Sequence, residues 1–118
     1  MTESGFRRLA LALPGAEERQ HMNHPDFRVV GKIFATMGYP RRGCAMIKLT
    51  PADQLAFTSI DPDAFVPVKG AWGERGCTNV ILEAAAVGPV KAALRAAYDA
   101  LLAARPAKAT RRRRARTA

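Results

Sequence analysis

The stretch Asp26-Phe27-Arg28-Val29-Val30-Gly31-Lys32-Ile33-Phe34-Ala35-Thr36-Met37 decides the fold of this chain. Two runs rich in β-branched and aromatic residues flank Gly31-Lys32, which predicts two antiparallel strands joined by a two-residue turn. A glycine at the first central position favours a type II′ turn, because that position requires a positive φ. In this register Val29 lies opposite Phe34, and Val30 lies opposite Ile33.

Further strands are expected on both sides of this hairpin. The polar residues 17–22 predict a short edge strand, and the side chains of residues 44–49 alternate as in a strand with one buried face. Residues 64–68 and 78–83 are also expected to be extended, the second of them because it is rich in β-branched residues. Residues 70–76 contain three glycines and are expected to form a loop.

Three helices are expected, at residues 3–13, 51–59 and 88–104. Thr50 can cap the second helix, and Pro51 suits its first position because proline lacks the N–H that would be unsatisfied there. The third helix carries an apolar stripe at helical spacing. The stripe consists of Val90, Leu94, Ala97, Tyr98, Leu101 and Leu102.

This order of elements predicts an α+β fold, in which helices cover one face of an antiparallel sheet. The residues expected to face the helices are Phe27, Val29, Phe34, Ala45 and Ile47. The other face is left open, and it mixes apolar and basic side chains. Its expected members are Arg28, Val30, Ile33, Met46 and Lys48. Such a face is either a binding surface or an ordinary half-solvated sheet face.

Charge divides the 118 residues into two parts. Residues 105–118 hold seven of the 19 Lys and Arg residues and no acid, which leaves 12 Lys and Arg against 10 Asp and Glu in residues 1–104. A dense run of arginines repels itself and remains solvated, so residues 105–118 are expected to be a disordered tail. The same charge density attracts polyanions such as nucleic acid, although a basic terminus can also be merely solubilising.

The two cysteines, Cys44 and Cys77, form no paired motif, and they are expected to be buried, reduced thiols in a cytoplasmic protein. No signal peptide or membrane span is visible in the sequence. His21 and His24 have the spacing of some metal ligands, but they fall at a strand end and a turn, so a structural role is expected. The sequence also contains no nucleophile motif. It therefore predicts no cofactor, no metal and no enzymatic activity.

Trp72, the one tryptophan, lies in the glycine-rich segment. We expect its indole to fold back over the edge of the core. The alternative is an exposed ring that stacks on a base or fills a pocket of a partner protein. The segment Gly73-Glu74-Arg75-Gly76 matches the GXXG motif of KH domains, but it precedes a strand instead of joining two helices, so the match is expected to be accidental.

Several segments, taken in order, resemble the YjbR/MmcQ family of small bacterial proteins. They are Leu13–Glu18, His24–Val29, Gly31–Thr36, Met46–Leu49, Asp61–Phe65 and Trp72–Gly76. The resemblance implies a two-layer α-β(3)-α-β(2)-α fold, like that of secretion chaperones, over residues 1–104. It also implies DNA binding through two projecting β-hairpins, a double wing, and supplies no catalytic residues. This chain departs from the family pattern at Cys77, where an aromatic residue is common, and in the arginine tail.

The sequence and the resemblance together predict a protein that binds DNA or RNA, mainly through the phosphate backbone. The residues expected to contact nucleic acid are Arg28, Lys32, Arg41, Arg42, Lys48, Trp72, Arg75, Arg111, Arg112, Arg113, Arg114 and Arg116. The alternative is a protein-interaction or chaperone-like module that uses the open face of the sheet. The oligomeric state is left open.

Overall fold

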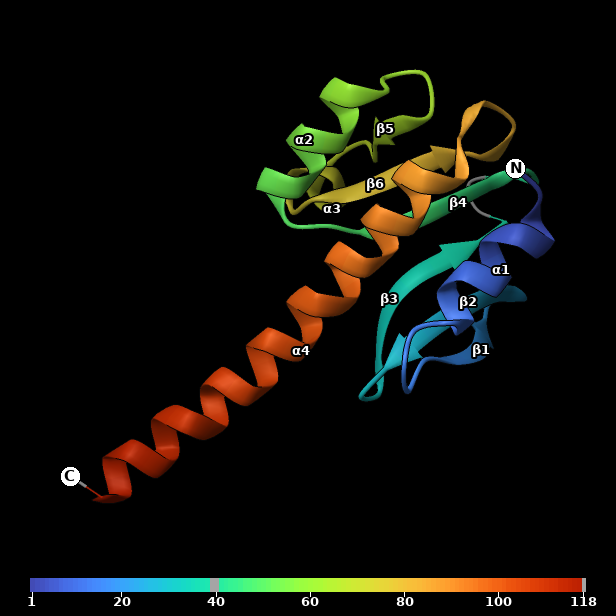
Figure 1. The fold of residues 1–118 in the computed structure, drawn as a ribbon. Helices are drawn as coiled ribbons and strands as arrows, with labels where there is room; N and C mark the ends of the chain where they lie inside the picture. Colours follow the sequence, from blue (N-terminus) through green and yellow to red (C-terminus); the bar gives the residue numbers. More distant parts are fainter. Residues whose placement is uncertain (39–40, 118) are drawn as a thin grey trace.

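The computed structural model of the protein describes residues 1–38 and 41–117, with side chains as far as residue 104 (Figure 1). The N-terminal elements are α1 (Glu3–Leu11), β1 (Glu17–His21), β2 (His24–Val29), β3 (Lys32–Met37) and β4 (Cys44–Lys48). The later elements are α2 (Pro51–Ile60), β5 (Phe65–Pro67), α3 (Ala71–Glu74), β6 (Cys77–Ile81), the 3₁₀ turn η1 (Leu82–Ala84) and α4 (Val87–Thr117).

The strands form one antiparallel sheet in the order β1-β2-β3-β4-β6-β5. Helices α1, α2 and α4 lie on one side of this sheet, which confirms the predicted two-layer α+β fold (Figure 1). Four strands precede α2, one more than the family formula counts, because the polar segment Glu17–His21 forms the outer edge. In the part of the chain that is described, no helix combines the length and apolar character needed to cross a membrane.

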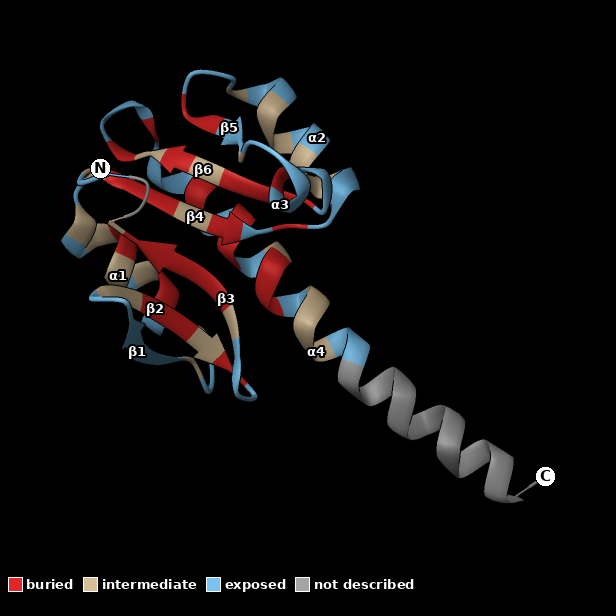
Figure 2. Ribbon diagram, turned by 180° about the vertical axis from the view of Figure 1, so that it is seen from behind, coloured by how far each residue is buried: buried red, intermediate tan, exposed pale blue. Residues whose placement is uncertain are grey.

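The core lies between the sheet and the helices, as the alternating pattern predicts. Every residue expected to face the helices is buried, and Figure 2 shows the buried residues concentrated along the central strands. Phe34 meets the ring of Tyr98 on α4 edge to face at 6.1 Å, and Phe6 of α1 meets Phe27 at 6.0 Å. Full burial of each large apolar side chain contributes roughly 1.5–3 kcal/mol, so these contacts fix the helices on the sheet.

The helix boundaries follow their capping residues. The Thr50 hydroxyl accepts a hydrogen bond from the Asp53 N–H at 3.2 Å, and Pro51 occupies the first position of α2, as predicted. The expected apolar stripe of α4 is buried or half-buried, from Val90 to Leu102. The structure gives α4 as far as Thr117, so its predicted end at residue 104 is wrong. The side chains of residues 105–118 are not described, and the predicted disorder of this tail stays a prediction.

The hairpin turn was predicted one residue too late. Its central residues are Val30 and Gly31, with φ of 48° and 77°, so the turn has the two positive φ values of type I′. Val29 pairs with Lys32 and Arg28 with Ile33, and a bulge follows at Phe27/Arg28. The bulge lets the consecutive residues Phe34 and Ala35 both be buried, which strict alternation does not allow. Val30 consequently lies in the turn and not on the open face.

The glycine-rich segment contains one short helix, α3, where a loop was expected. Gly70 has a φ of 81° and precedes the helix, and Gly76 has a φ of 110° and follows it. These two glycines therefore act as the boundaries of a helical turn. Only Gly73 lies inside it, so the count of three glycines overstated their effect on regular structure.

Candidate nucleic-acid interface

The open face of the sheet can be followed strand by strand, because paired residues point to the same side. One row across all six strands is Arg19, Asp26, Thr36, Met46, Asn79 and Val66. The middle of this row is covered, since Thr36 is buried and Met46 and Asn79 are half-buried. Charged side chains therefore mark the ends and edges of the open face, and its centre carries none.

Asp26 is a buried acid on this face. Its carboxylate accepts hydrogen bonds from Arg28 Nε at 2.8 Å and Arg28 Nη2 at 3.1 Å, and its Oδ2 lies 2.8 Å from His21 Nδ1. The hydrogen bonds from Arg28 lower the pKa of Asp26, burial acts in the opposite direction, and His21 lowers it further. Arg28, a predicted phosphate ligand, is thus already engaged by an acid.

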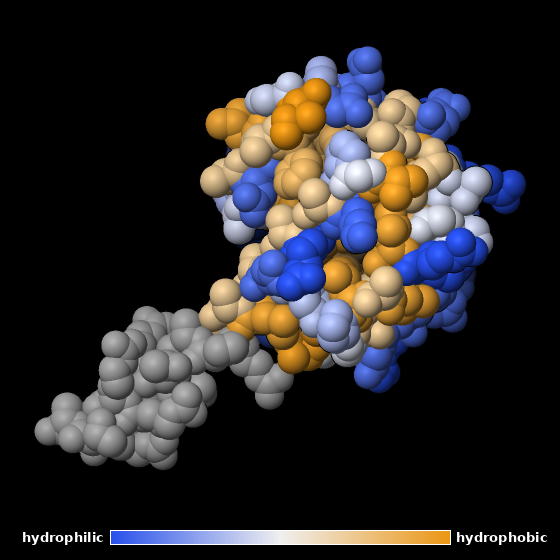
Figure 3. All heavy atoms as spheres, in the orientation of Figure 1, coloured by the Kyte–Doolittle hydropathy of each residue, from blue (hydrophilic) through white to orange (hydrophobic). Residues whose placement is uncertain are grey.

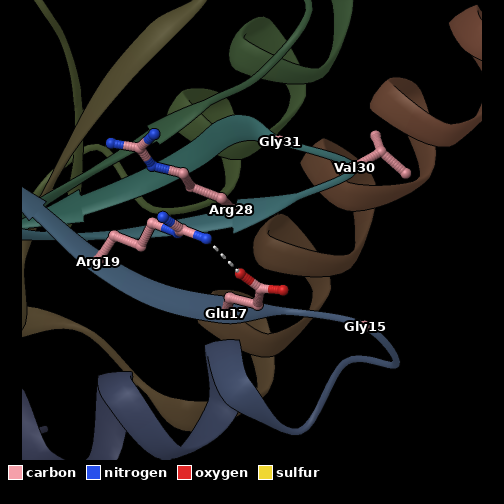
Figure 4. Close-up of a pocket in the computed structure, with 6 residues that line it drawn as sticks. All are labelled: Gly15, Glu17, Arg19, Arg28, Val30 and Gly31. Carbon is pink, nitrogen blue, oxygen red and sulfur yellow. Dashed lines mark hydrogen bonds and ion pairs between the residues drawn. The ribbon is translucent and has the colours of Figure 1, made fainter.

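A hollow of about 320 Å³ lies beside Arg28, at the edge formed by β1 and β2 (Figure 4). Two arginines line it, Arg28 and Arg19, and Arg19 Nη2 lies 3.3 Å from Glu17 Oε2. Figure 4 shows this second ion pair directly. Because each guanidinium has an acid partner, the net charge of the hollow is small, and its attraction for phosphate is correspondingly weak.

A different group of side chains lies at the end of β4. Lys48 Nζ is 5.7 Å and Arg75 Cζ is 5.5 Å from the ring centroid of Trp72, and the three residues are defined here as the basic–aromatic cluster. Trp72 is 57% exposed, so the expectation that its indole closes the core edge is wrong. No ion pair with an acid is recorded for Lys48 or Arg75 among the described residues.

The charges of the two cations also act on the thiol of Cys77. Burial raises the pKa of its thiol, and the positive charges of Lys48 and Arg75 act in the opposite direction. Both cations therefore lie near the same sulfur. Cys44 and Cys77 are both free and buried, as predicted.

The cluster is held by a tightly packed backbone. A Cβ on Gly73 would lie 1.6 Å from the Val68 carbonyl oxygen, and a Cβ on Gly76 would lie 2.0 Å from the Leu49 carbonyl oxygen. Gln54 of α2 donates from Nε2 to the carbonyl oxygens of Gly73 and Cys77, both at 3.0 Å. The turn that carries Trp72 is thus fixed against β4, β6 and α2.

The remaining predicted residues lie elsewhere. Lys32 pairs with Val29, whose side chain faces the helices, so Lys32 lies on the other side of the hairpin from Arg28. Arg41 and Arg42 precede β4 and therefore lie at the end of the sheet opposite Lys48. A hydrogen bond to the Cys44 side chain raises the pKa of Arg41, and Glu83 is near enough to add to that effect.

The structure therefore brings Lys48, Trp72 and Arg75 together and places the other described candidates apart from them. Arg111, Arg112, Arg113, Arg114 and Arg116 lie outside the described side chains, and their roles stay predictions. Sequence reasoning missed the part played by Asp26, although the spacing of Asp26 and Arg28 along a strand places both on one face. It also missed Gln54, whose amide reaches α3 across 19 residues of sequence, and no local signal indicates that contact.

An open antiparallel sheet with helices on one side defines a small two-layer α+β domain (Figures 1 and 2), and the basic–aromatic cluster lies at the end of β4. The chain belongs to the YjbR family, whose model matches residues 11–107. The match starts at the end of α1 and reaches into α4, so it includes every strand of the sheet. A search of curated proteins finds no match.

Proposed function

We propose that this protein is a non-enzymatic, cytoplasmic DNA-binding protein that contacts mainly the phosphate backbone. The observation that carries the proposal is the basic–aromatic cluster, in which Lys48 and Arg75 flank the exposed ring of Trp72. Lysine, arginine and an aromatic ring are the groups that bind phosphates and bases without reading a sequence. The seven cations of residues 105–118 add the larger share of the charge.

The distribution of charge on the described body favours contact with nucleic acid at the basic–aromatic cluster. Four of its arginines pair with acids, as in Arg7–Glu18 and Arg95–Asp99, and these pairs lie away from the cluster. Lys48 and Arg75 keep their charge available because, among the side chains that the structure describes, no such pair holds either of them. RNA carries the same phosphate charge, so a preference for DNA or RNA is an outcome of the test.

The alternative, a protein-interaction module that uses the open sheet face, has weaker support. The most exposed aliphatic side chains are Met22 in the β1–β2 turn and Leu55 and Ile60 on α2, and none of them lies on that face. Figure 3 shows hydrophobic residues over α2 on the helix-covered side, interspersed with hydrophilic ones. A surface for a protein partner would therefore have to include α2.

A mobility-shift assay with the full chain and a 20-base-pair duplex tests the proposal at two salt concentrations. The double variant Lys48→Ala/Arg75→Ala should bind more weakly and lose about 2 from the log–log salt slope, since each phosphate contact contributes about 0.9. The matched control is Arg8→Ala/Lys91→Ala, which removes the same charge from exposed positions on α1 and α4. Equal weakening in both variants, or no binding by the wild type at low salt, contradicts the proposal.

A further inference from the structure

We propose that Trp72 stacks on an unpaired nucleobase, so that the folded body prefers single-stranded nucleic acid to duplex. The inference rests on the proposed function and names the form of nucleic acid that the cluster recognises. Its starting point is an indole that is 57% exposed, on a domain whose other aromatic side chains in the described residues are buried or half-buried. Exposure of a large ring costs favourable burial, which a ligand that covers the ring restores.

The backbone that carries Trp72 is suited to hold the indole in place as a stacking surface. Gly73 follows it and packs so closely on Val68 that no side chain fits, and Gln54 holds the carbonyl oxygens on either side of the Arg75–Gly76 turn. These contacts fix the backbone that carries the ring, so less freedom is lost there when the ring binds a base. Pre-organisation of this kind increases affinity because less ordering is needed on binding.

The two cations do not prevent stacking. Their distances from the ring centroid, 5.5 and 5.7 Å, are close to the limit of about 6 Å for a cation–π contact. Lys48 and Arg75 are exposed, with long side chains that can turn from the ring toward neighbouring phosphates. A base would then cover the indole while the cations neutralise the backbone on either side of it.

Duplex DNA cannot satisfy this arrangement. Its bases are stacked on one another, and their faces are exposed only where the strand is unpaired. Phosphates are available in both forms, so Lys48, Arg75 and the arginine tail do not distinguish them. Trp72 is therefore the group that makes the distinction.

Trp72 is the only tryptophan in the chain, so intrinsic fluorescence reports on this site alone. The full chain is titrated with a 12-residue oligothymidylate and with a 12-base-pair duplex at one salt concentration. Stacking on thymine should quench the fluorescence, whereas the duplex should bind with little quenching. In mobility-shift titrations, which do not need a tryptophan signal, Trp72→Leu should lose about 5- to 100-fold in affinity for the single strand and less than about 2-fold for the duplex. Trp72→Phe, which keeps a ring, should retain most of the preference.

The outcomes separate this inference from the proposed function. If both oligonucleotides bind but neither changes the fluorescence, or if Trp72→Leu weakens both equally, stacking is refuted and the phosphate-binding function stands. If neither binds at low salt, both fail. Circular dichroism of Trp72→Leu establishes that it is folded, and the retained duplex affinity of the same variant provides a second check.

Discussion

Replacing Gly73 by alanine should destabilise the domain, although the substitution adds a single methyl group. An ideal Cβ at Gly73 lies 1.6 Å from the Val68 carbonyl oxygen and 2.7 Å from its carbonyl carbon. Real Cβ contacts are essentially never shorter than 3.0 Å, so α3 or the Val68 segment must move by more than 1 Å. Both atoms at Val68 are backbone, and neither can turn aside as a flexible side chain would.

The cost has two parts. Forcing an extra methyl group into a packed site costs about 1–3 kcal/mol. The shift also weakens the hydrogen bond from Gln54 Nε2 to the Gly73 carbonyl oxygen, and a typical hydrogen bond contributes about 0.5–1.5 kcal/mol. The free energy of unfolding should therefore fall by about 2–4 kcal/mol, a large fraction of the total stability of a small domain.

Denaturant unfolding followed by circular dichroism measures this loss. The matched control is Gly5→Ala in α1, where a Cβ meets Thr2 Oγ1 at 3.4 Å and the Met1 side chain at 3.5 Å, both ordinary contacts. Since alanine is the better helix former, this control should be neutral or stabilising by up to about 1 kcal/mol. If Gly73→Ala is as stable as the wild type, α3 does not pack on Val68, and the account of how Trp72 is held is wrong.

Three further predictions concern charge. The pKa of Asp26 is lowered below the ordinary 3.8, so its ionised carboxylate stabilises the fold at higher pH, and this stabilisation is lost as the pH falls through the folded pKa. In acid titrations below about pH 4, the Asp26→Asn variant should therefore lose less stability than the wild type. Removing residues 105–118, which contain no apolar side chain larger than alanine or proline, should leave the melting temperature of the body nearly unchanged in calorimetry, and a loss of several degrees would show that the tail docks. Lys32→Ala and Arg75→Ala should weaken duplex binding additively, since the two residues lie on different elements without shared partners, and a non-additive mobility-shift titration would contradict this.

The sequence alone is sufficient to predict an element where a single local rule determines it. The α2 start at Thr50-Pro51 follows from capping, and the buried alternation of Ala45 and Ile47 follows from strand geometry, and both were predicted correctly. The two-layer fold followed from the order of such elements. These features need no knowledge of distant contacts.

Features that depend on distant contacts were not predictable. The hairpin turn lies at Val30-Gly31, one residue earlier than expected, and the bulge at Phe27/Arg28 accompanies the joint burial of Phe34 and Ala35. The Trp72 indole was expected to fold back over the edge of the core, yet it is 57% exposed, on a turn whose Gly73 packs against Val68. The open face was predicted to mix apolar and basic side chains, but Asp26 neutralises Arg28, and the available charge remains at the end of β4.

The salt dependence of duplex DNA binding tests the central claim most directly. The full chain is compared with the chain that ends at residue 104, each over a range of salt concentrations. Five to seven neutralised phosphates predict a log–log slope of about −4.5 to −6 for the full chain. Three contacts of the body, from Lys32, Lys48 and Arg75, predict a slope of about −3 for the shorter chain. A slope near zero for the full chain, or no complex at low salt, would contradict the account.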